Sequence, residues 1–219
     1  PLLDLNIKLN DVKVNNRLKI DYLQFSEKQL IGILGESGSG KSTLIKIMTG
    51  WIENESALIE INGQILTPLE AKKYVAYLPQ YDILYDNITV YNALFYTAIF
   101  QKQNKSKKEI KKQIEHILFK TGLMGCCNKK ICNLSGGQRR RVNIANQLLR
   151  ENILLLVLDE PTSGLDLAND YKIMDMLKQI SKQGRTVILS THHLANMDIF
   201  DQVVILKKGE IESSGLPCE

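Results

Sequence analysis

One short run of the sequence has the residue types needed to hold the phosphates of a nucleotide. It fits the pattern G-x-x-x-x-G-K-[ST] and consists of Gly35, Glu36, Ser37, Gly38, Ser39, Gly40, Lys41, Ser42 and Thr43. Glycines let the backbone turn its N–H groups toward phosphate oxygens, and a helix that follows adds the positive end of its dipole. We expect Lys41 to reach the β- and γ-phosphates and the hydroxyl of Ser42 to hold Mg²⁺.

The residues on both sides of this run support the phosphate-binding interpretation. Residues 30–34 are apolar apart from one glycine and predict a buried strand, whereas residues 44–49 predict a helix that Gly50 ends. A phosphate loop needs a strand before it and a helix after it. The alternative is a chance turn rich in glycine and serine, for which this context has no explanation.

A pair of acids at the end of an apolar run is the second candidate for chemistry. Residues 153–158 form a continuous apolar stretch that predicts a strand buried on both faces, and Asp159 and Glu160 follow it directly. Ligands of parallel-sheet folds bind beyond the carboxyl ends of the strands. Asp159 therefore suits a Mg²⁺ ligand, direct or through water, and Glu160 suits a group that orients or deprotonates an attacking water. The alternative is a pair of solvated loop acids.

The composition indicates a globular protein without a membrane span of its own. The 219 residues are 44% hydrophobic and carry a net charge of +4, with both signs interspersed. Nucleic-acid-binding domains have a denser basic face, so we expect no nucleic-acid partner. The longest apolar run, residues 153–158, is far shorter than the roughly 20 residues of a membrane helix. The chain opens at Pro1 without a signal-peptide pattern, and we expect it to belong to a longer polypeptide.

Two further groups of residues are interpreted as having no special function. Four cysteines are expected to be reduced thiols of a cytosolic protein, because their spacing does not suit zinc: Cys126, Cys127, Cys132 and Cys218. The lysines of residues 102–112 are expected to form a solvated helix face. Contact with nucleic acid or lipid is the alternative that this run leaves open.

The periodicity predicts an α/β fold with a helical insertion. Polar and apolar residues alternate through residues 1–30 and 57–66, which predicts antiparallel strands with a type I′ turn at Asn62-Gly63. Further strands are expected at residues 74–78, 153–158, 186–190, 202–206 and 210–213, and helices at residues 105–120, 138–149 and 170–183. We assign residues 1–88 to an antiparallel β-layer with the first half of a mostly parallel core, residues 89–150 to an all-helical subdomain, and residues 151–219 to the second half of the core.

Four more motifs, in a fixed order, make the chain resemble a known family. The motifs are Gln80 after a strand, Leu134-Ser135-Gly136-Gly137-Gln138, the run from Asp159 to Asp166, and Thr191-His192 after a strand. They resemble the Q-loop, signature, Walker B with D-loop, and switch histidine of ATP-binding cassette (ABC) proteins, whose core is a P-loop NTPase. The resemblance covers essentially the whole chain. Ser163-Gly164-Leu165-Asp166 is most similar to reverse-order exporters, in which the ATPase domain precedes the membrane domain.

The resemblance implies a role for each of these residues in binding and hydrolysing ATP with Mg²⁺. It implies that Ser42 and Asp159 hold Mg²⁺ with Gln80 completing the shell, and that Thr43 and the backbone before it take the α- and β-phosphates. It also implies that Glu160 polarises water and that His192 links the γ-phosphate to Glu160. His193 is expected to have no role.

The resemblance also implies a second anion site and therefore a dimer. Ser135 is a suitable N-cap, and the glycines after it leave backbone N–H groups bare at a helix start. In the family, this site closes on the γ-phosphate held by another copy, in a head-to-tail dimer around two ATP. The residues implied to act in trans are Ser135, Gly136, Gly137, Gln138 and Asp166. Loss of the γ-phosphate then removes charge-assisted hydrogen bonds and opens the dimer.

The chain departs from the family at the nucleotide base. Members usually stack an aromatic ring on adenine, but Val12-Lys13-Val14 occupies the corresponding stretch here. Tyr22 lies too near the strand to replace it. We therefore expect aliphatic contact with the base and looser nucleotide selectivity.

The resemblance leaves the purpose of hydrolysis open between three functions. A transporter, with export favoured, is the first. Aromatic residues crowd residues 80–100, where the family docks the coupling helix of a transmembrane domain, although these rings also suit the core of the insertion. A transporter domain would lie at the cytoplasmic face of a membrane, and the isolated fragment would be soluble. A soluble mechanoenzyme of the translation-factor type and a non-hydrolysing sensor are the alternatives, and intact Glu160 and His192 argue against the sensor.

Overall fold

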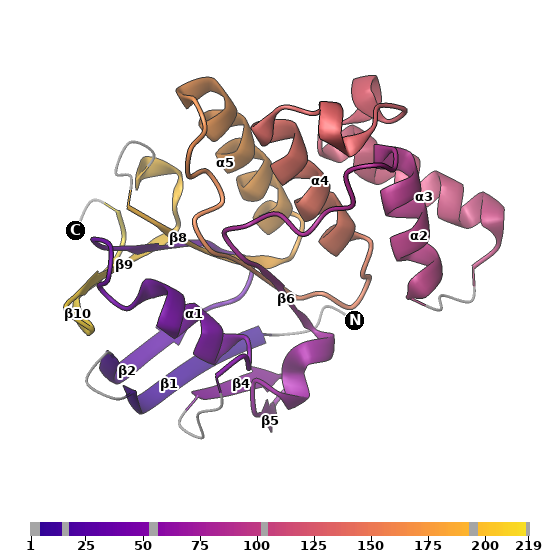
Figure 1. The fold of residues 1–219 in the computed structure, drawn as a ribbon. Helices are drawn as coiled ribbons and strands as arrows, with labels where there is room; N and C mark the ends of the chain where they lie inside the picture. The colour runs from indigo at the N-terminus through magenta and orange to yellow at the C-terminus, as the bar shows by residue number, and fades with distance from the viewer. Residues whose placement is uncertain (1–4, 15–17, 53–56, 102–104, 193–196, 218–219) are drawn as a thin grey trace. The chain divides into compact units, whose positions relative to one another are not determined.

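The computed structural model describes residues 5–14, 18–52, 57–101, 105–192 and 197–217, and His193 and Cys218 lie outside this part of the chain. The described chain forms two compact units (Figure 1). We call Pro1–Gln80, Leu154–Ser163 and Leu177–Glu219 the core unit, and Tyr81–Ile153 with Gly164–Met176 the helical unit. The three-part division expected from the sequence stays a prediction.

The first sheet of the core unit is antiparallel, with the strand order β2-β1-β4-β5. Its strands are β1 (Leu5–Val14), β2 (Leu18–Phe25), β4 (Ala57–Ile61) and β5 (Gln64–Leu66). Alternate residues of β1, such as Leu5, Ile7 and Leu9, are buried, as the period-two pattern predicts. Asn62 and Gly63 both have positive φ, of 52° and 76°, which matches the predicted type I′ turn.

The second sheet of the core unit has the order β10-β9-β3-β8-β7-β6 and is parallel except for its edge strand β10. Its strands are β3 (Leu30–Leu34), β6 (Val75–Leu78), β7 (Leu155–Leu158), β8 (Thr186–Thr191), β9 (Gln202–Lys207) and β10 (Glu210–Gly215). The strand predicted at residues 153–158 begins two residues later, at Leu155. Because parallel strands end at one edge, the residues that follow β3, β6, β7 and β8 gather there.

Helix α1 (Lys41–Met48) packs into the same hydrophobic core as both sheets. It lies between them in Figure 1. Leu44, Ile45 and Ile47 are fully buried there, and Gly50 follows the helix with a φ of 69°, as predicted. Two 3₁₀ turns, η1 (Glu70–Lys73) and η4 (Met197–Ile199), complete the connections.

The helical unit contains α2 (Val90–Phe100), α3 (Lys107–Lys120), η2 (Met124–Cys126), η3 (Ile131–Asn133) and α4 (Gly136–Leu148). Helix α3 begins with the predicted capping box of Ser106 and Glu109, and α4 begins with a similar box. Helix α5 (Leu167–Lys182) begins in the helical unit and ends in the core unit. The predictions started α4 and α5 two and three residues late, because they missed the first turn after each N-cap.

The predicted α/β class with an antiparallel layer and a helical insertion is confirmed. No helix in the described ranges is both long enough and apolar enough to cross a membrane. Cys126, Cys127 and Cys132 are free thiols. The described lysines of α3 lie on exposed positions around its buried face of Ile110, Ile114, Ile117 and Leu118.

Candidate functional site

The phosphate loop connects β3 to α1, as the sequence predicts, and its backbone has no room for a side chain at Gly35. A Cβ atom there would collide with the Leu206 carbonyl oxygen and with Ser39 Oγ, and the φ of 154° also favours glycine. The loop therefore lies tightly against β9. This contact fixes the backbone groups that are expected to face phosphate.

Lys41 is held inside the loop that precedes it. Its side chain is almost wholly buried, with 4% of the residue exposed. Its ammonium donates to the carbonyl oxygens of Gly35, at 2.7 Å, and of Glu36, at 2.9 Å. Burial lowers the pKa of this ammonium, and the nearby carboxylates of Glu160 and Asp159 act in the opposite direction. The result is a positive charge fixed at the centre of the loop.

Asp159 lies where the loop and two strand ends meet. The hydroxyls of Ser42 and Ser190 both donate to its Oδ1, at 3.1 Å and 2.6 Å. Ser190 is fully buried at the end of β8, and its Oγ also accepts a hydrogen bond of 2.9 Å from the Glu160 N–H. One serine therefore positions both acids. Sequence reasoning missed Ser190, because its partners lie about 30 residues away and no motif includes it.

Glu160 stands between Gln80 and His192, and the family resemblance implies only the second of these contacts. Its carboxylate lies 3.4 Å from Gln80 Nε2 and 3.4 Å from His192 Nδ1, through different oxygen atoms. Its backbone has a φ of 44°, a left-handed conformation that is unusual for any residue except glycine. Strain of this kind needs support from neighbours, and the hydrogen bond to Ser190 supplies it.

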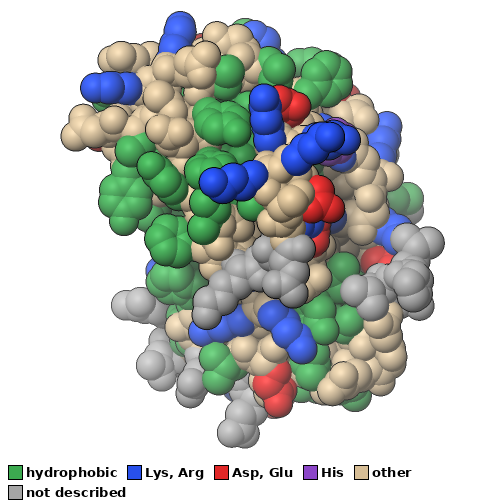
Figure 2. All heavy atoms as spheres, turned by 90° about the vertical axis from the view of Figure 1, so that its right-hand side faces the viewer, with side chains coloured by type: hydrophobic (Ala, Val, Ile, Leu, Met, Phe, Trp, Pro, Cys, Tyr) green, Lys and Arg blue, Asp and Glu red, His purple; other side chains and the backbone are tan. Residues whose placement is uncertain are grey.

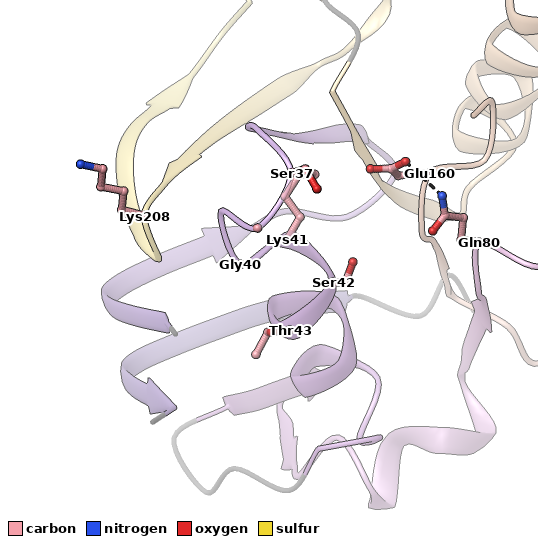
Figure 3. A pocket seen from close by; sticks show the side chains of 9 residues that line it. Ser37, Gly40, Lys41, Ser42, Thr43, Gln80, Glu160 and Lys208 are labelled. Atoms are coloured by element: carbon pink, nitrogen blue, oxygen red, sulfur yellow. Dashed lines mark hydrogen bonds between the residues drawn. The ribbon is translucent and has the colours of Figure 1, made fainter. Parts of the chain in front are cut away.

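A cavity of about 590 Å³ joins most of these groups (Figure 3). It is lined by Ser37, Gly38, Gly40, Lys41, Ser42, Thr43, Gln80, Glu160 and Lys208, all of which belong to the core unit. All but Lys208 are predicted site residues. The phosphate loop, the β9–β10 turn, the residues that follow β6 and β7, and the start of α1 thus meet around one polar cavity.

Lys208 also lines a second cavity of about 410 Å³. The other described residues around it are Lys13, Val14, Leu18, Lys19, Gly209 and Glu210. Lys208 and Gly209 form the turn between β9 and β10, with φ values of 49° and 85°. The sequence predicted this hairpin but no role for Lys208, because a lysine in a turn carries no signal of its own.

The predicted signature residues come together in the helical unit. Ser135 caps α4, because its Oγ accepts from the Gln138 N–H and Gln138 Oε1 accepts from the Ser135 N–H. A Cβ on Gly137 would come within 2.8 Å of Asn169 Oδ1, so any larger residue would have to displace the Asn169 side chain. Asp166 accepts from the Asn169 N–H at 2.9 Å, and this bond lowers the pKa of its carboxyl group.

A group of charges joins the signature helix to the segment that follows Gln80. Arg139 pairs with Asp86 at 2.7 Å and with Asp82 at 3.5 Å, and Arg140, which is buried, lies 3.7 Å from Asp82. Sequence reasoning missed this network. An arginine directly after the signature motif is its only signal.

The aromatic residues predicted at 80–100 are exposed or half-buried, and none of them belongs to the buried core. Tyr81, Tyr85 and Phe100 are 80%, 82% and 83% exposed, whereas Tyr91 and Phe95 stack with their ring centres 6.1 Å apart. Figure 2 shows hydrophobic side chains lying among lysine and arginine side chains on one face of the molecule. The exposed rings are available for docking, whereas no aromatic residue of this region is buried in the interior of the insertion.

The chain is similar in sequence to known ABC transporters. The protein-family model described as ABC transporter matches residues 18–163. ABC transporter G family member 2 of Arabidopsis thaliana is 35% identical over 220 residues, which cover 95% of this chain and 29% of the relative. An ABC transporter ATP-binding/permease protein of Mycobacterium tuberculosis is 34% identical over 183 residues, covering 82% of this chain and 21% of the relative.

A solved structure supports the same assignment. The cbiO1 protein of Clostridium perfringens, described as part of the ABC transporter complex cbiONQ, superposes with a TM-score of 0.86 at 28% identity. The match covers 98% of this chain and 89% of that one. The chain thus spans nearly the whole of this structure but less than a third of the curated relatives above.

Proposed function

Because the chain belongs to the ABC transporter family, we propose that its cavity binds and hydrolyses Mg·ATP to drive transport through a separate membrane domain. The observation that carries this proposal is the group of side chains around the larger cavity. A buried lysine, a serine whose hydroxyl donates to Asp159 and a supported glutamate line it, from parts of the sequence that are far apart.

The residues present fit a magnesium ion. Ser42 Oγ and Asp159 Oδ1 lie 3.1 Å apart and offer the hard oxygen ligands that Mg²⁺ prefers. Among the described residues, no three His, Cys, Asp or Glu side chains are grouped to hold a metal alone. Phosphate oxygens and water would therefore supply the other ligands. When bound, the ion would neutralise charge between the β- and γ-phosphates.

Hydrolysis needs a water aligned with the γ-phosphate and a base that orients it. Glu160 is suited to this task, because Gln80 and His192 contact its two oxygens and Ser190 holds its backbone. Lys41 would stabilise the charge on the phosphates. The loop backbone would fix the polyphosphate, so that little reorganisation is needed at the moment of reaction.

We also propose that two copies, or one copy and a related chain, close head to tail around two ATP. The support is that the two sets of residues proposed to bind the γ-phosphate lie in different units of the chain. The described residues that line the phosphate cavity all belong to the core unit, whereas Ser135, Gly136 and Gly137 start a helix in the helical unit. An exposed helix start with bare N–H groups is an anion site. A second chain would supply it to the γ-phosphate.

The membrane partner would dock on the exposed aromatic residues that follow Gln80. Tyr81, Ile83 and Tyr85 are large, exposed and close in sequence, as expected of a surface that receives a helix. Arg139 and Asp86 join this segment to the signature helix, which gives docking a route to the γ-phosphate. This arrangement would hold the chain at the cytoplasmic face of a membrane.

The test is hydrolysis by the purified chain together with its oligomeric state. We expect Mg·ATP turnover that depends on protein concentration, because two copies form each site. We also expect a dimer by light scattering when hydrolysis is blocked. Turnover that stays constant per molecule down to concentrations at which only monomer is present would contradict the proposal.

A further inference from the structure

We infer that the outer side of α3 binds the surface of a membrane that contains anionic lipids. The residues that carry this inference are Lys108, Lys112 and Phe119, which we call the lysine face. The inference goes beyond the proposed function, because it adds a direct contact with lipid to the attachment through a membrane domain. It is tested without nucleotide, so its failure and a failure of ATP hydrolysis are distinguishable.

The geometry of α3 places the lysine face away from the rest of the helical unit. The helix packs against α2, α4 and η2 (Figure 1). Its buried residues are Ile110, Ile114, Ile117 and Leu118. Lys108, Lys112 and Phe119 are exposed. Because one turn takes about 3.6 residues, positions four and eleven residues after Lys108 lie on the same side of the helix. The three side chains therefore follow one line along α3.

Helix α3 carries more positive charge than its own carboxylates balance. It contains five lysines and two glutamates, whereas the neighbouring α2 contains no charged residue. One glutamate takes part in the capping box, and the other, Glu115, lies 3.9 Å from Lys111. In the described part of the chain, no carboxylate lies within 4.0 Å of the ammonium of Lys107, Lys108 or Lys112. An anionic partner would complement this excess charge.

The positions of the lysines are unfavourable for a helix that faces only water. Lys107 and Lys108 occupy the first turn, where the helix dipole disfavours positive charge. Lys107 and Lys111 are four residues apart, as are Lys108 and Lys112, and like charges at this spacing repel each other. Negative charges outside the helix would reduce both costs. The arrangement therefore favours an anionic surface over solvent.

Exposed apolar side chains near both ends of the lysine face favour lipid as the source of that negative charge. Phe119 is 77% exposed in line with the lysines. Helix α2 ends shortly before α3 begins, and its last residues Ile99 and Phe100 are 49% and 83% exposed. Residues 102–104 between them lie outside the described ranges, and nothing here depends on them. Lysines beside exposed aromatic and aliphatic groups are typical of helices that lie at a membrane surface. An acidic peptide would pair with the lysines and leave these groups in water.

The expected binding is weak and reversible. A lysine near an anionic leaflet contributes a factor of about five to the affinity. Attraction of this kind falls off within a Debye length, so it acts only when α3 is already close to the lipid. A membrane domain that holds the chain at the bilayer would supply this proximity. Contact through the lysine face would then orient the helical unit relative to the membrane.

Sedimentation with lipid vesicles tests the inference on the purified chain without nucleotide. One set of vesicles contains phosphatidylcholine alone, and the other contains roughly a third phosphatidylserine, an anionic lipid. We expect binding to the anionic vesicles only. A rise in ionic strength from about 0.1 M to about 1 M shortens the Debye length from about 10 Å to about 3 Å and should release the chain.

Paired lysine variants test whether the lysine face is responsible. Lys108→Gln with Lys112→Gln should weaken binding to the anionic vesicles by about 25-fold, since two lysines are removed from the surface. The matched control is Lys172→Gln with Lys182→Gln, which removes the same charge from exposed positions of α5. The control should bind within about twofold of the parent chain, because only charges near the lipid contribute.

An aromatic variant separates lipid from other anionic partners. Phe119→Ser should weaken vesicle binding by about tenfold, because an apolar ring no longer enters the interface. Tyr171→Ser removes an exposed ring from α5 and is the control. Soluble polyglutamate serves as a purely ionic competitor. It should displace the chain from vesicles only in large excess.

Three results would overturn the inference. The first is absence of binding to the anionic vesicles, or equal binding to both kinds. The second is an equal loss of binding in the α3 and α5 lysine pairs, which would show a general effect of charge. The third is binding that polyglutamate displaces readily and that Phe119→Ser leaves unchanged, which would identify an acidic protein segment as the partner. ATP hydrolysis by the same preparations reports on the proposed function separately.

Discussion

The two regions that we propose to bind phosphate are built in opposite ways. In the core unit, Ser42, Asp159, Glu160 and Ser190 come from three separate stretches and are joined by hydrogen bonds across many residues of sequence. In the helical unit, the signature is a local structure, a capping box between residues three positions apart. The first region therefore exists only in the folded unit, whereas the second needs little more than a helix start.

This difference suggests separate tasks for the two regions. A buried site whose residues are joined by hydrogen bonds is preorganised. It suits tight binding and catalysis, because its dipoles need not reorient during the reaction. An exposed helix start binds anions weakly by itself, since water competes for its N–H groups. The helical unit would then act only when a phosphate is already held for it. The predictions below test this contrast, from the largest expected effect to the smallest.

Removing the charge at the centre of the core-unit site should have the largest effect. Lys41→Ala is expected to weaken Mg·ATP binding by about 100-fold or more, because charge-assisted hydrogen bonds contribute about 1.5–3 kcal/mol each. Titration calorimetry measures the loss. Lys46→Ala, on the same helix but outside the cavity, is the control. Tight binding by the Lys41→Ala chain would contradict the assignment of the phosphate loop.

Neutralising the proposed base should separate binding from chemistry. Glu160→Gln is expected to lower kcat by about 100-fold or more while ATP still binds, because loss of a general base costs a factor of about 10²–10⁴. The ATP-bound dimer should accumulate, and light scattering would detect it. A chain that remains monomeric at saturating ATP would argue that the two regions do not meet across a dimer.

Ser190 should matter because it positions two acids. Ser190→Ala is expected to lower the free energy of unfolding by about 1–3 kcal/mol, since buried partners lose their hydrogen bonds. It should also lower kcat with little change in KM. Ser190→Thr keeps the hydroxyl and should recover kcat. Ser181→Ala removes another buried serine hydroxyl and should reduce stability alone. Equal kcat values for the two alanine variants would refute the positioning role.

The smallest expected effects come from removing the serine of each capping box. Ser106→Ala and Ser135→Ala should each lower the free energy of unfolding by about 1 kcal/mol, because each removes one helix cap. Only Ser135→Ala should also reduce ATP hydrolysis, since α3 has no phosphate to bind. Urea unfolding and steady-state kinetics measure the two effects. An identical loss of activity in both variants would mean that Ser135 is only a cap.

Local patterns predicted much of this fold from the sequence. The alternation in β1, the turn at Asn62-Gly63 and the capping box at Ser106 each depend on residues within a few positions of one another. The phosphate loop was found for the same reason. The predicted ends of helices and strands were less accurate. Leu167, for example, begins α5 directly after Asp166, whose carboxylate accepts a hydrogen bond from the Asn169 N–H.

The missed residues are those whose partners are distant in the sequence. Ser190 contacts Asp159, Lys208 reaches two cavities, and Asn169 packs on Gly137. Each has an ordinary residue type at an ordinary position, so no period or motif marks it. The order of the strands in the sheet creates these contacts. That order follows from packing of the whole core unit and is not contained in any single segment.

The central claim is that each site is completed by a second copy, and mixing two inactive variants tests it most directly. Lys41→Ala has a defective phosphate loop, and Ser135→Glu has a signature that repels the γ-phosphate. Each dimer of one variant has a defect in both sites, whereas the mixed dimer has one site with both parts intact. We predict that ATP hydrolysis, absent in either variant alone, returns on mixing. Full hydrolysis by Ser135→Glu alone, or no recovery in mixed dimers confirmed by light scattering, would contradict the account.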